Sequence, residues 1–280
     1  MGNKSLALGA LVSLVVACGS SASSDDGATP SGGSPPGATA PVAPVAAGDH
    51  ALVLTFGGDV LPAVRDRVTA LVTNAAPLPV KTLDASQAPP ALASDSIVLS
   101  FGDTTAAKGV VDPAALAKLG PEGLVVRSGT VAGATILAAR GNAPDAATSN
   151  HGNLGTAFAA YAMLEELGFA FLHPLAPVAP TKIALPSHSI DIAESPAWRV
   201  RGMHLHSMHP LELTDMLQGF GPNGTDDEAG WNARLPEWDR FLEWMLANRQ
   251  NRVEWVLLYA DSWKDFADGT TRQNRFATLV

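Results

Sequence analysis

The chain has 280 residues, with 18 Lys and Arg against 27 Asp and Glu, which gives a formal net charge of −9. Because no cluster of Lys or Arg interrupts this acidic balance, the sequence lacks the basic stripe that binds phosphate backbones, and we expect no nucleic acid partner. A single cysteine excludes both an intrachain disulfide and a thiolate metal cage. Apolar burial must therefore hold the fold, and hydrophobic residues at 46% make that feasible.

Residues 1–18 have the pattern of a targeting signal. A basic start is followed by an apolar run over residues 6–17 and then by Cys18. The run is shorter than the roughly 20 residues that span a bilayer. It resembles a bacterial lipoprotein signal and lipobox, which implies cleavage after Ala17 and a lipid on Cys18. The protein would then be anchored by lipid to a membrane of the bacterial cell envelope, facing the periplasm or the exterior. An ordinary secretory signal with an incidental cysteine is the alternative.

Residues 19–49 predict a disordered tether. They consist mostly of Ser, Gly, Ala, Pro and Thr, with almost no large side chain. Such a segment buries too little apolar surface to offset the entropy lost on ordering. We expect it to hold a folded part away from the membrane.

Residues 50–194 predict an α+β domain, because β-rich runs alternate with apolar residues at helical spacing and Gly or Pro separates them. The expected elements, in chain order, are a strand at 51–56, a helix at 61–72, a strand at 97–101, a helix at 113–119 with Asp112 as N-cap, paired strands at 123–128 and 135–140, and a helix at 155–167 ended by Gly168.

The last helix of this domain carries a resemblance. Residues 155–174 resemble the final helix and strand of the small domain that precedes the barrel in family 20 hexosaminidases, α-glucuronidases and related glycoside hydrolases. In those families this domain is a scaffold without catalytic residues. The resemblance therefore implies that His151 and His173 are structural or exposed.

Residues 195–280 predict the first βα units of a TIM-type (β/α)8 barrel. We expect a strand at 199–208, a glycine-rich loop at 219–230, a helix opening at 235–238 and a strand at 253–260. A complete barrel needs about 250 residues, so this part is expected to be an incomplete barrel. The whole chain is then a tether, one complete domain and roughly the first third of a second.

The first barrel strand carries an unusual row of side chains. Residues 201–209 resemble the first barrel strand of the hexosaminidases, in which Arg-Gly is followed by two residues, Leu-Asp, two residues and Arg-His. Arg201 and Gly202 match, whereas His206 stands at the position of the family's Asp and His209 at that of its Arg. The resemblance implies that Arg201 binds sugar hydroxyls.

His204 and His206 share one face of this strand and allow three interpretations. They line a sugar site, they fill a polar barrel mouth, or they begin a metal site of the His-x-His type found in amidohydrolases. Catalytic zinc needs about three protein ligands, and the others would have to come from later strands, so we assign no metal.

Asp261 and Trp263 follow the expected strand at 253–260, at the end where barrel enzymes place their chemistry. The carboxylate is suited to sugar hydroxyls and the indole to the apolar face of a pyranose. The alternative for Asp261 is the N-cap of a following helix.

The resemblance implies a parent enzyme that cleaves glycosidic bonds by protonating the leaving oxygen with a carboxylic acid. In the hexosaminidases an Asp-Glu pair after the fourth barrel strand does this, and we expect that pair to lie beyond these residues, so no catalytic residue is assigned. The sequence predicts the N-terminal portion of a membrane-anchored, glycoside hydrolase-like protein that acts on glycans without a cofactor. The competing hypothesis is a surface lipoprotein that binds carbohydrate without catalysis.

Overall fold

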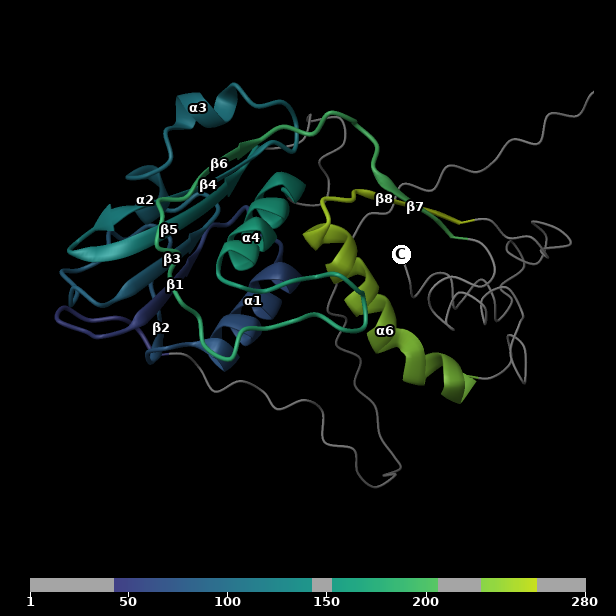
Figure 1. Cartoon of the computed structure of the whole chain (residues 1–280), viewed down its shortest axis with the longest axis horizontal. Coiled ribbons are helices and arrows are strands. Elements are labelled where there is room, and N and C mark those ends of the chain that lie inside the picture. The colour runs from purple at the N-terminus through teal and green to yellow at the C-terminus, as the bar shows by residue number, and fades with distance from the viewer. Residues whose placement is uncertain (1–42, 143–152, 206–227, 256–280) are drawn as a thin grey trace, which may run out of the picture. The chain divides into compact units, whose positions relative to one another are not determined.

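The computed structural model describes residues 43–142, 153–205 and 228–255 (Figure 1). The predicted lipidation site Cys18 lies outside these ranges. The chain divides into two compact units between Ala197 and Trp198, with His173–Leu175 joining the second. We call them the N-terminal unit and the C-terminal unit and describe each by itself. Within the described ranges, no helix has the length and apolar character that crossing a membrane requires.

The N-terminal unit is built on one six-stranded sheet. In chain order its strands are β1 (Leu52–Phe56), β2 (Val80–Thr82), β3 (Ile97–Phe101), β4 (Leu124–Val131), β5 (Ala134–Gly141) and β6 (Asp191–Glu194). In space they follow the order β2-β1-β3-β5-β4-β6. The first four in this order pair in parallel, whereas β4 pairs antiparallel with both β5 and β6. The unit is thus a mixed α/β fold with a parallel-rich sheet, and the finer likeness to a hexosaminidase domain stays a prediction.

Helices cover both faces of this sheet, which explains why β1 and β3 are almost entirely apolar and buried. The longer helices α1 (Pro62–Ala75) and α4 (Leu154–Glu166) lie together on one side (Figure 1). The short helices α2 (Thr105–Lys108) and α3 (Pro113–Ala117) pack on the other, where Ala106 and Leu116 join a buried cluster with strand residues such as Val98.

Most of the expected elements of this unit are confirmed. The strands at 51–56 and 97–101 and the long first helix form as β1, β3 and α1, and the paired strands form the antiparallel β4–β5 hairpin. Asp112 caps α3 as expected, with its Oδ1 accepting from the Ala114 N–H at 2.8 Å. Gly168 ends α4 with a φ of 92°, the left-handed conformation that glycine favours. The expected helix at 113–119 is shorter, ending at Ala117.

Sequence reasoning missed β2, α2 and β6, which have three or four residues each. Residues that precede β1 in the chain hold the edge strand β2 in place. Residues 43–45 pair along its outer side, and the Lys81 Nζ donates to Asp49 Oδ2 at 2.8 Å. The bonds from Lys81 and from the Ala46 N–H hold the pKa of Asp49 below its usual range, so the carboxylate stays charged at neutral pH.

The described residues of the C-terminal unit form a strand-helix-strand repeat: β7 (Gly202–Leu205), α6 (Glu228–Ala247) and β8 (Arg252–Trp255). The two strands pair in parallel, with Gly202 opposite Arg252 and His204 opposite Glu254. Apolar side chains of α6 form a core with both strands, and the cluster consists of Trp231, Trp238, Phe241, Met245 and Val253, with Met203 and Leu235 packed against it. The expected βαβ unit is therefore present, while the residues expected to extend these strands, 206–208 and 256–260, lie outside the described ranges.

The expected start of the helix in the C-terminal unit was wrong. The glycine-rich loop was expected to run to Gly230 and the helix to open at 235–238, but α6 already begins at Glu228 and contains Pro236 within it. A proline inside a helix removes a backbone hydrogen bond and costs about 3 kcal/mol. Burial of Trp231, which is 2% exposed in the same cluster as Trp238, offsets this cost and extends the helix by two turns.

Close backbone contact between β5 and the start of α4 yields a first prediction. A Cβ added at Gly141 would lie 1.8 Å from the Gly155 carbonyl carbon, whereas one added at Gly58 would meet nothing within 4 Å. We expect Gly141→Ala to destabilise the N-terminal unit by at least about 3 kcal/mol, because backbone rather than a flexible side chain must move. Urea unfolding measures this, with Gly58→Ala as the matched control. Equal unfolding midpoints for the two variants would contradict the close packing.

Candidate functional site

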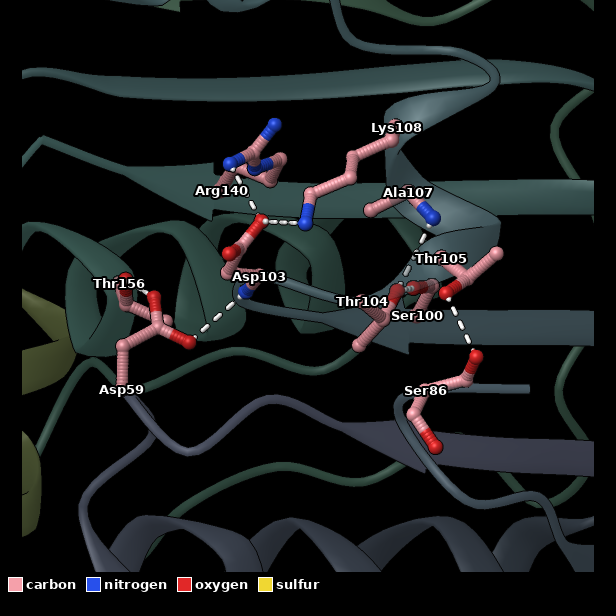
Figure 2. Close-up of polar contacts among 10 residues, drawn as sticks. All are labelled: Asp59, Ser86, Ser100, Asp103, Thr104, Thr105, Ala107, Lys108, Arg140 and Thr156. Carbon is pink, nitrogen blue, oxygen red and sulfur yellow. Dashed lines mark hydrogen bonds and ion pairs between the residues drawn. The ribbon is translucent and has the colours of Figure 1, made fainter. Parts of the chain in front are cut away.

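The carboxyl ends of β1 and β3 form the switch point of the N-terminal sheet. From β1 the chain crosses to β2 on one side, then returns past β1 to β3 on the other. In open α/β sheets, the crevice at such a switch point is where ligands commonly bind. Gly57, Gly58 and Asp59 follow β1, and Gly102 and Asp103 follow β3. Figure 2 shows that the polar side chains after these strands converge there.

Asp59 joins three elements at this edge (Figure 2). Its Oδ1 accepts from the backbone N–H of Asp103 at 2.7 Å, and its Oδ2 accepts from the Thr156 hydroxyl in the first turn of α4 at 2.8 Å. The negative charge also suits the positive end of the helix dipole. One carboxylate thus ties the turn after β1 to the turn after β3 and to α4.

Two glycines make room for this carboxylate. A Cβ at Gly57 would lie 2.4 Å from Asp59 Oδ1, and one at Gly102 would lie 2.3 Å from the same atom. Gly102 also has a φ of 76°, which side-chain-bearing residues rarely adopt. The sequence does contain a signal for this cluster, because glycine and then aspartate follow each of the two buried strands β1 and β3. Sequence analysis did not identify these aspartates as a cluster.

Asp103 forms ion pairs with two basic side chains at this edge. Its Oδ1 accepts from Arg140 Nη2 at 2.8 Å and lies 3.2 Å from Lys108 Nζ (Figure 2). The Arg140 side chain is only 11% exposed, and its Nη1 is buried without a hydrogen-bond partner in the part of the chain that the structure describes. With two acidic and two basic groups, the cluster is balanced in charge.

Hydroxyl groups fix the turn that carries Asp103. The Thr104 Oγ1 accepts from the Ala107 N–H at 2.9 Å and lies 2.5 Å from the Ser100 hydroxyl, and both side chains are buried. The Thr105 hydroxyl donates to the Ser86 carbonyl at 3.0 Å (Figure 2). These hydroxyl contacts, together with the two hydrogen bonds that Asp59 accepts, preorganise this edge as a structural junction.

The residues predicted to bind substrate all belong to the C-terminal unit. The structure describes Arg201 and the backbone of His204, which lies within β7. His206, Asp261 and Trp263 lie outside the described residues. The parallel pairing places the carboxyl ends of β7 and β8 at one edge.

Arg201 lies at the amino end of β7, and its side chain contacts main-chain carbonyls of two other segments. Its Nε donates to the Arg249 carbonyl at 2.6 Å, and its Nη1 donates to the Trp198 carbonyl at 2.7 Å. Asn251, just before β8, reinforces this junction: its Oδ1 accepts from the Arg201 N–H and its Nδ2 donates to the Arg199 carbonyl. These bonds give Arg201 an anchoring role, and direct contact with sugar stays a prediction.

No three His, Cys, Asp or Glu side chains within the described ranges are grouped as metal ligands. The metal interpretation of His204 and His206 depends on a residue outside those ranges.

No family model and no curated protein matches the chain. Among solved structures, one titled "Structure of CpGH84D" aligns with 12% sequence identity and a TM-score of 0.37, over 83% of this chain and 39% of that one. The chain thus spans well under half of that structure's length, and a TM-score this low supports no argument about function.

The Asp59 junction yields a second prediction. Hydrogen bonds to charged groups contribute about 1.5–3 kcal/mol, so a double-mutant cycle of Asp59→Asn and Thr156→Val should give a coupling energy in this range in urea unfolding. Asp66 on α1 is exposed and pairs with Arg65 at 3.6 Å, so Asp66→Asn with Thr156→Val is the matched cycle and should be additive. Additivity in both cycles would show that the Asp59–Thr156 bond does not stabilise the unit.

Proposed function

We propose that the chain is part of a glycan-handling protein of the bacterial cell envelope, related to glycoside hydrolases. The observation that carries this proposal is the parallel β7–α6–β8 unit. The segment whose Arg201-Gly202 motif resembles the first hexosaminidase barrel strand is a strand, and the next segment pairs parallel to it across a helix. A (β/α)8 barrel is a repetition of this unit.

In barrel enzymes the substrate binds at the carboxyl ends of the strands. His204 is one residue from the end of β7, and His206 follows the strand in sequence. We assign these imidazoles, together with Asp261 and Trp263, to the lining of a sugar site. An imidazole both donates to and accepts from hydroxyls, a carboxylate accepts from two neighbouring hydroxyls, and an indole covers the apolar face of a pyranose.

The N-terminal unit acts in this proposal as a scaffold. At its switch point Asp103 pairs with Arg140 and Lys108, and both carboxylate oxygens of Asp59 accept hydrogen bonds from the fold. A glycosidase needs a carboxylic acid placed to protonate the leaving oxygen, whereas the Asp59 and Asp103 carboxylates are held by groups of the fold. We therefore assign glycan binding to the C-terminal unit and no catalytic acid to the N-terminal one.

The third prediction tests glycan binding by the full chain. We expect an oligosaccharide array to detect binding, and calorimetry on the oligosaccharide so identified to show that His206→Ala or Trp263→Ala weakens it about tenfold or more, because stacking and hydrogen bonds to the sugar are lost. His188→Ala is the matched control, since His188 is 70% exposed in the N-terminal unit and lies 3.7 Å from Glu166. It should bind as the unaltered chain does.

Absence of glycan binding by the unaltered chain would refute the proposal. Binding without turnover of nitrophenyl glycosides, in the protein as its gene encodes it, would favour the non-catalytic carbohydrate-binding lipoprotein over the hydrolase.

The fourth prediction concerns the membrane anchor, which we propose from the lipobox resemblance at Cys18. In bacterial cells fed labelled palmitate, the unaltered chain should carry label and sediment with membranes. Cys18→Ser should abolish both, because the modified sulfur is gone. Ser20→Ala, two residues away, is the control and should be labelled normally. A labelled, membrane-bound Cys18→Ser variant would exclude the anchor.

A further inference from the structure

Residues 43–49, the last part of the segment that the sequence predicts as a tether, are bonded along the outer edge of β2. The Ala43 carbonyl accepts from the Thr82 N–H and the Val45 N–H donates to the Thr82 carbonyl, both at 3.0 Å. Pro44, which has no N–H to donate, is the parallel bridge partner of Thr82 between these two bonds. The Val45 side chain packs against the buried cluster that contains Val98. We call residues 43–49 the strap.

The Asp49 carboxylate joins the strap to β2. Its Oδ2 accepts from Lys81 Nζ at 2.8 Å and from the Ala46 N–H at 2.6 Å. The lysine side chain is 25% exposed and the aspartate 22%, so the ion pair is largely withdrawn from water. Hydrogen bonds to an ionised group are stronger than those between neutral groups. The pair therefore latches the strap to the edge strand, and we call it the latch.

The Asp49 backbone is fastened to the sheet separately from its carboxylate. Its carbonyl accepts from the Ala93 N–H at 3.1 Å and from the Ser96 hydroxyl at 2.7 Å. The Ser96 Oγ in turn accepts from the Ala51 N–H at 3.1 Å, immediately before β1. Opening of the latch would therefore leave the chain fixed at Asp49, just ahead of β1.

A flexible position separates the latched part of the strap from this fixed point. Gly48 has a φ of 80°, and a Cβ added there would meet nothing within 4 Å. Its N–H donates to the Ala91 carbonyl at 2.8 Å, which also belongs to the fixed side. Residues 43–47 precede Gly48 and are held on β2 by the bonds to Thr82, the packing of Val45 and the latch.

From these contacts we propose that the strap is a local opening device, in which residues 43–47 leave and rejoin the edge of β2 under control of the latch while β1 stays in the sheet. Local opening costs less free energy than global unfolding when few contacts are lost. A displacement that arrives along the chain from its N-terminal side reaches the strap before it reaches β1. The closed strap also covers the edge of β2, where unpaired N–H and carbonyl groups would accept a foreign strand.

The fifth prediction tests the latch by amide hydrogen exchange, followed by NMR in the full chain. Val45 and Thr82 report on the strap, because each N–H is bonded across the strap–β2 contact. Leu83 reports on the other side of β2, where its N–H donates to the Leu54 carbonyl at 2.9 Å. We expect Lys81→Met to speed exchange at Val45 and Thr82 about fivefold or more and to leave Leu83 unchanged, since only the strap opens more often.

Lys108→Met is the matched control. Lys108 lies on α2 and its Nζ is 3.2 Å from Asp103 Oδ1, so the same substitution removes a lysine–aspartate pair elsewhere in the unit. It should leave exchange at Val45 and Thr82 unchanged. Asp49→Asn should speed exchange at the same two amides. Combined with Lys81→Met, it should speed them less than the product of the two single effects, because both substitutions remove one interaction.

Unchanged exchange at Val45 and Thr82 in Lys81→Met would refute the latch. Equal acceleration at Leu83 would show that β2 leaves the sheet together with the strap, which overturns the proposal of a local opening. Independent effects of Asp49→Asn and Lys81→Met would also overturn it, because the ion pair would then not be what holds the strap closed.

Discussion

The N-terminal unit depends on a single carboxylate placed where its chain changes direction. Asp59 accepts from the turn after β3 and from α4 at once, so the two halves of the parallel sheet and the helix that covers them meet at one group. The junction requires glycine at positions 57 and 102, because a side chain at either would occupy the space of the Asp59 carboxylate. The Asp59 junction lies at the switch point, where many α/β proteins bind ligands. In this protein, the Asp59 carboxylate at that point stabilises the fold.

The C-terminal unit uses its polar groups differently. Arg201 and Asn251 fasten the amino ends of β7 and β8, while α6 buries one face of the pair under tryptophan and phenylalanine. The opposite face keeps the Arg252–Glu254 pair, with the carboxylate half exposed. The unit thus has a fixed amino end, an apolar face against α6 and a charged face. The proposed glycan chemistry is assigned to the carboxyl ends of the two strands.

Sequence patterns predicted the elements whose signals are local. The apolar runs of β1 and β3, the Asp112 cap and the left-handed Gly168 all depend on neighbouring residues, and all are confirmed. The short strands β2 and β6 depend on pairing with distant segments, and α6 is extended past the expected proline boundary by burial of Trp231. The Asp59 junction was missed for the same reason, since its partners lie 44 and 97 residues away. Arg201 was singled out from a motif, and its backbone contacts emerged only once Trp198 and Arg249 were placed beside it.

The most direct test of the account is a map of backbone amide chemical shifts in the full chain, recorded by NMR as a neutral oligosaccharide is titrated in. Binding at the carboxyl ends of β7 and β8 predicts that the perturbed amides cluster around His204 and Glu254, with saturation at a single affinity. Amides around Asp59 and Asp103 should not shift. Perturbations centred on the Asp59 junction, or none anywhere in the chain, would contradict the assignment of glycan binding to the C-terminal unit.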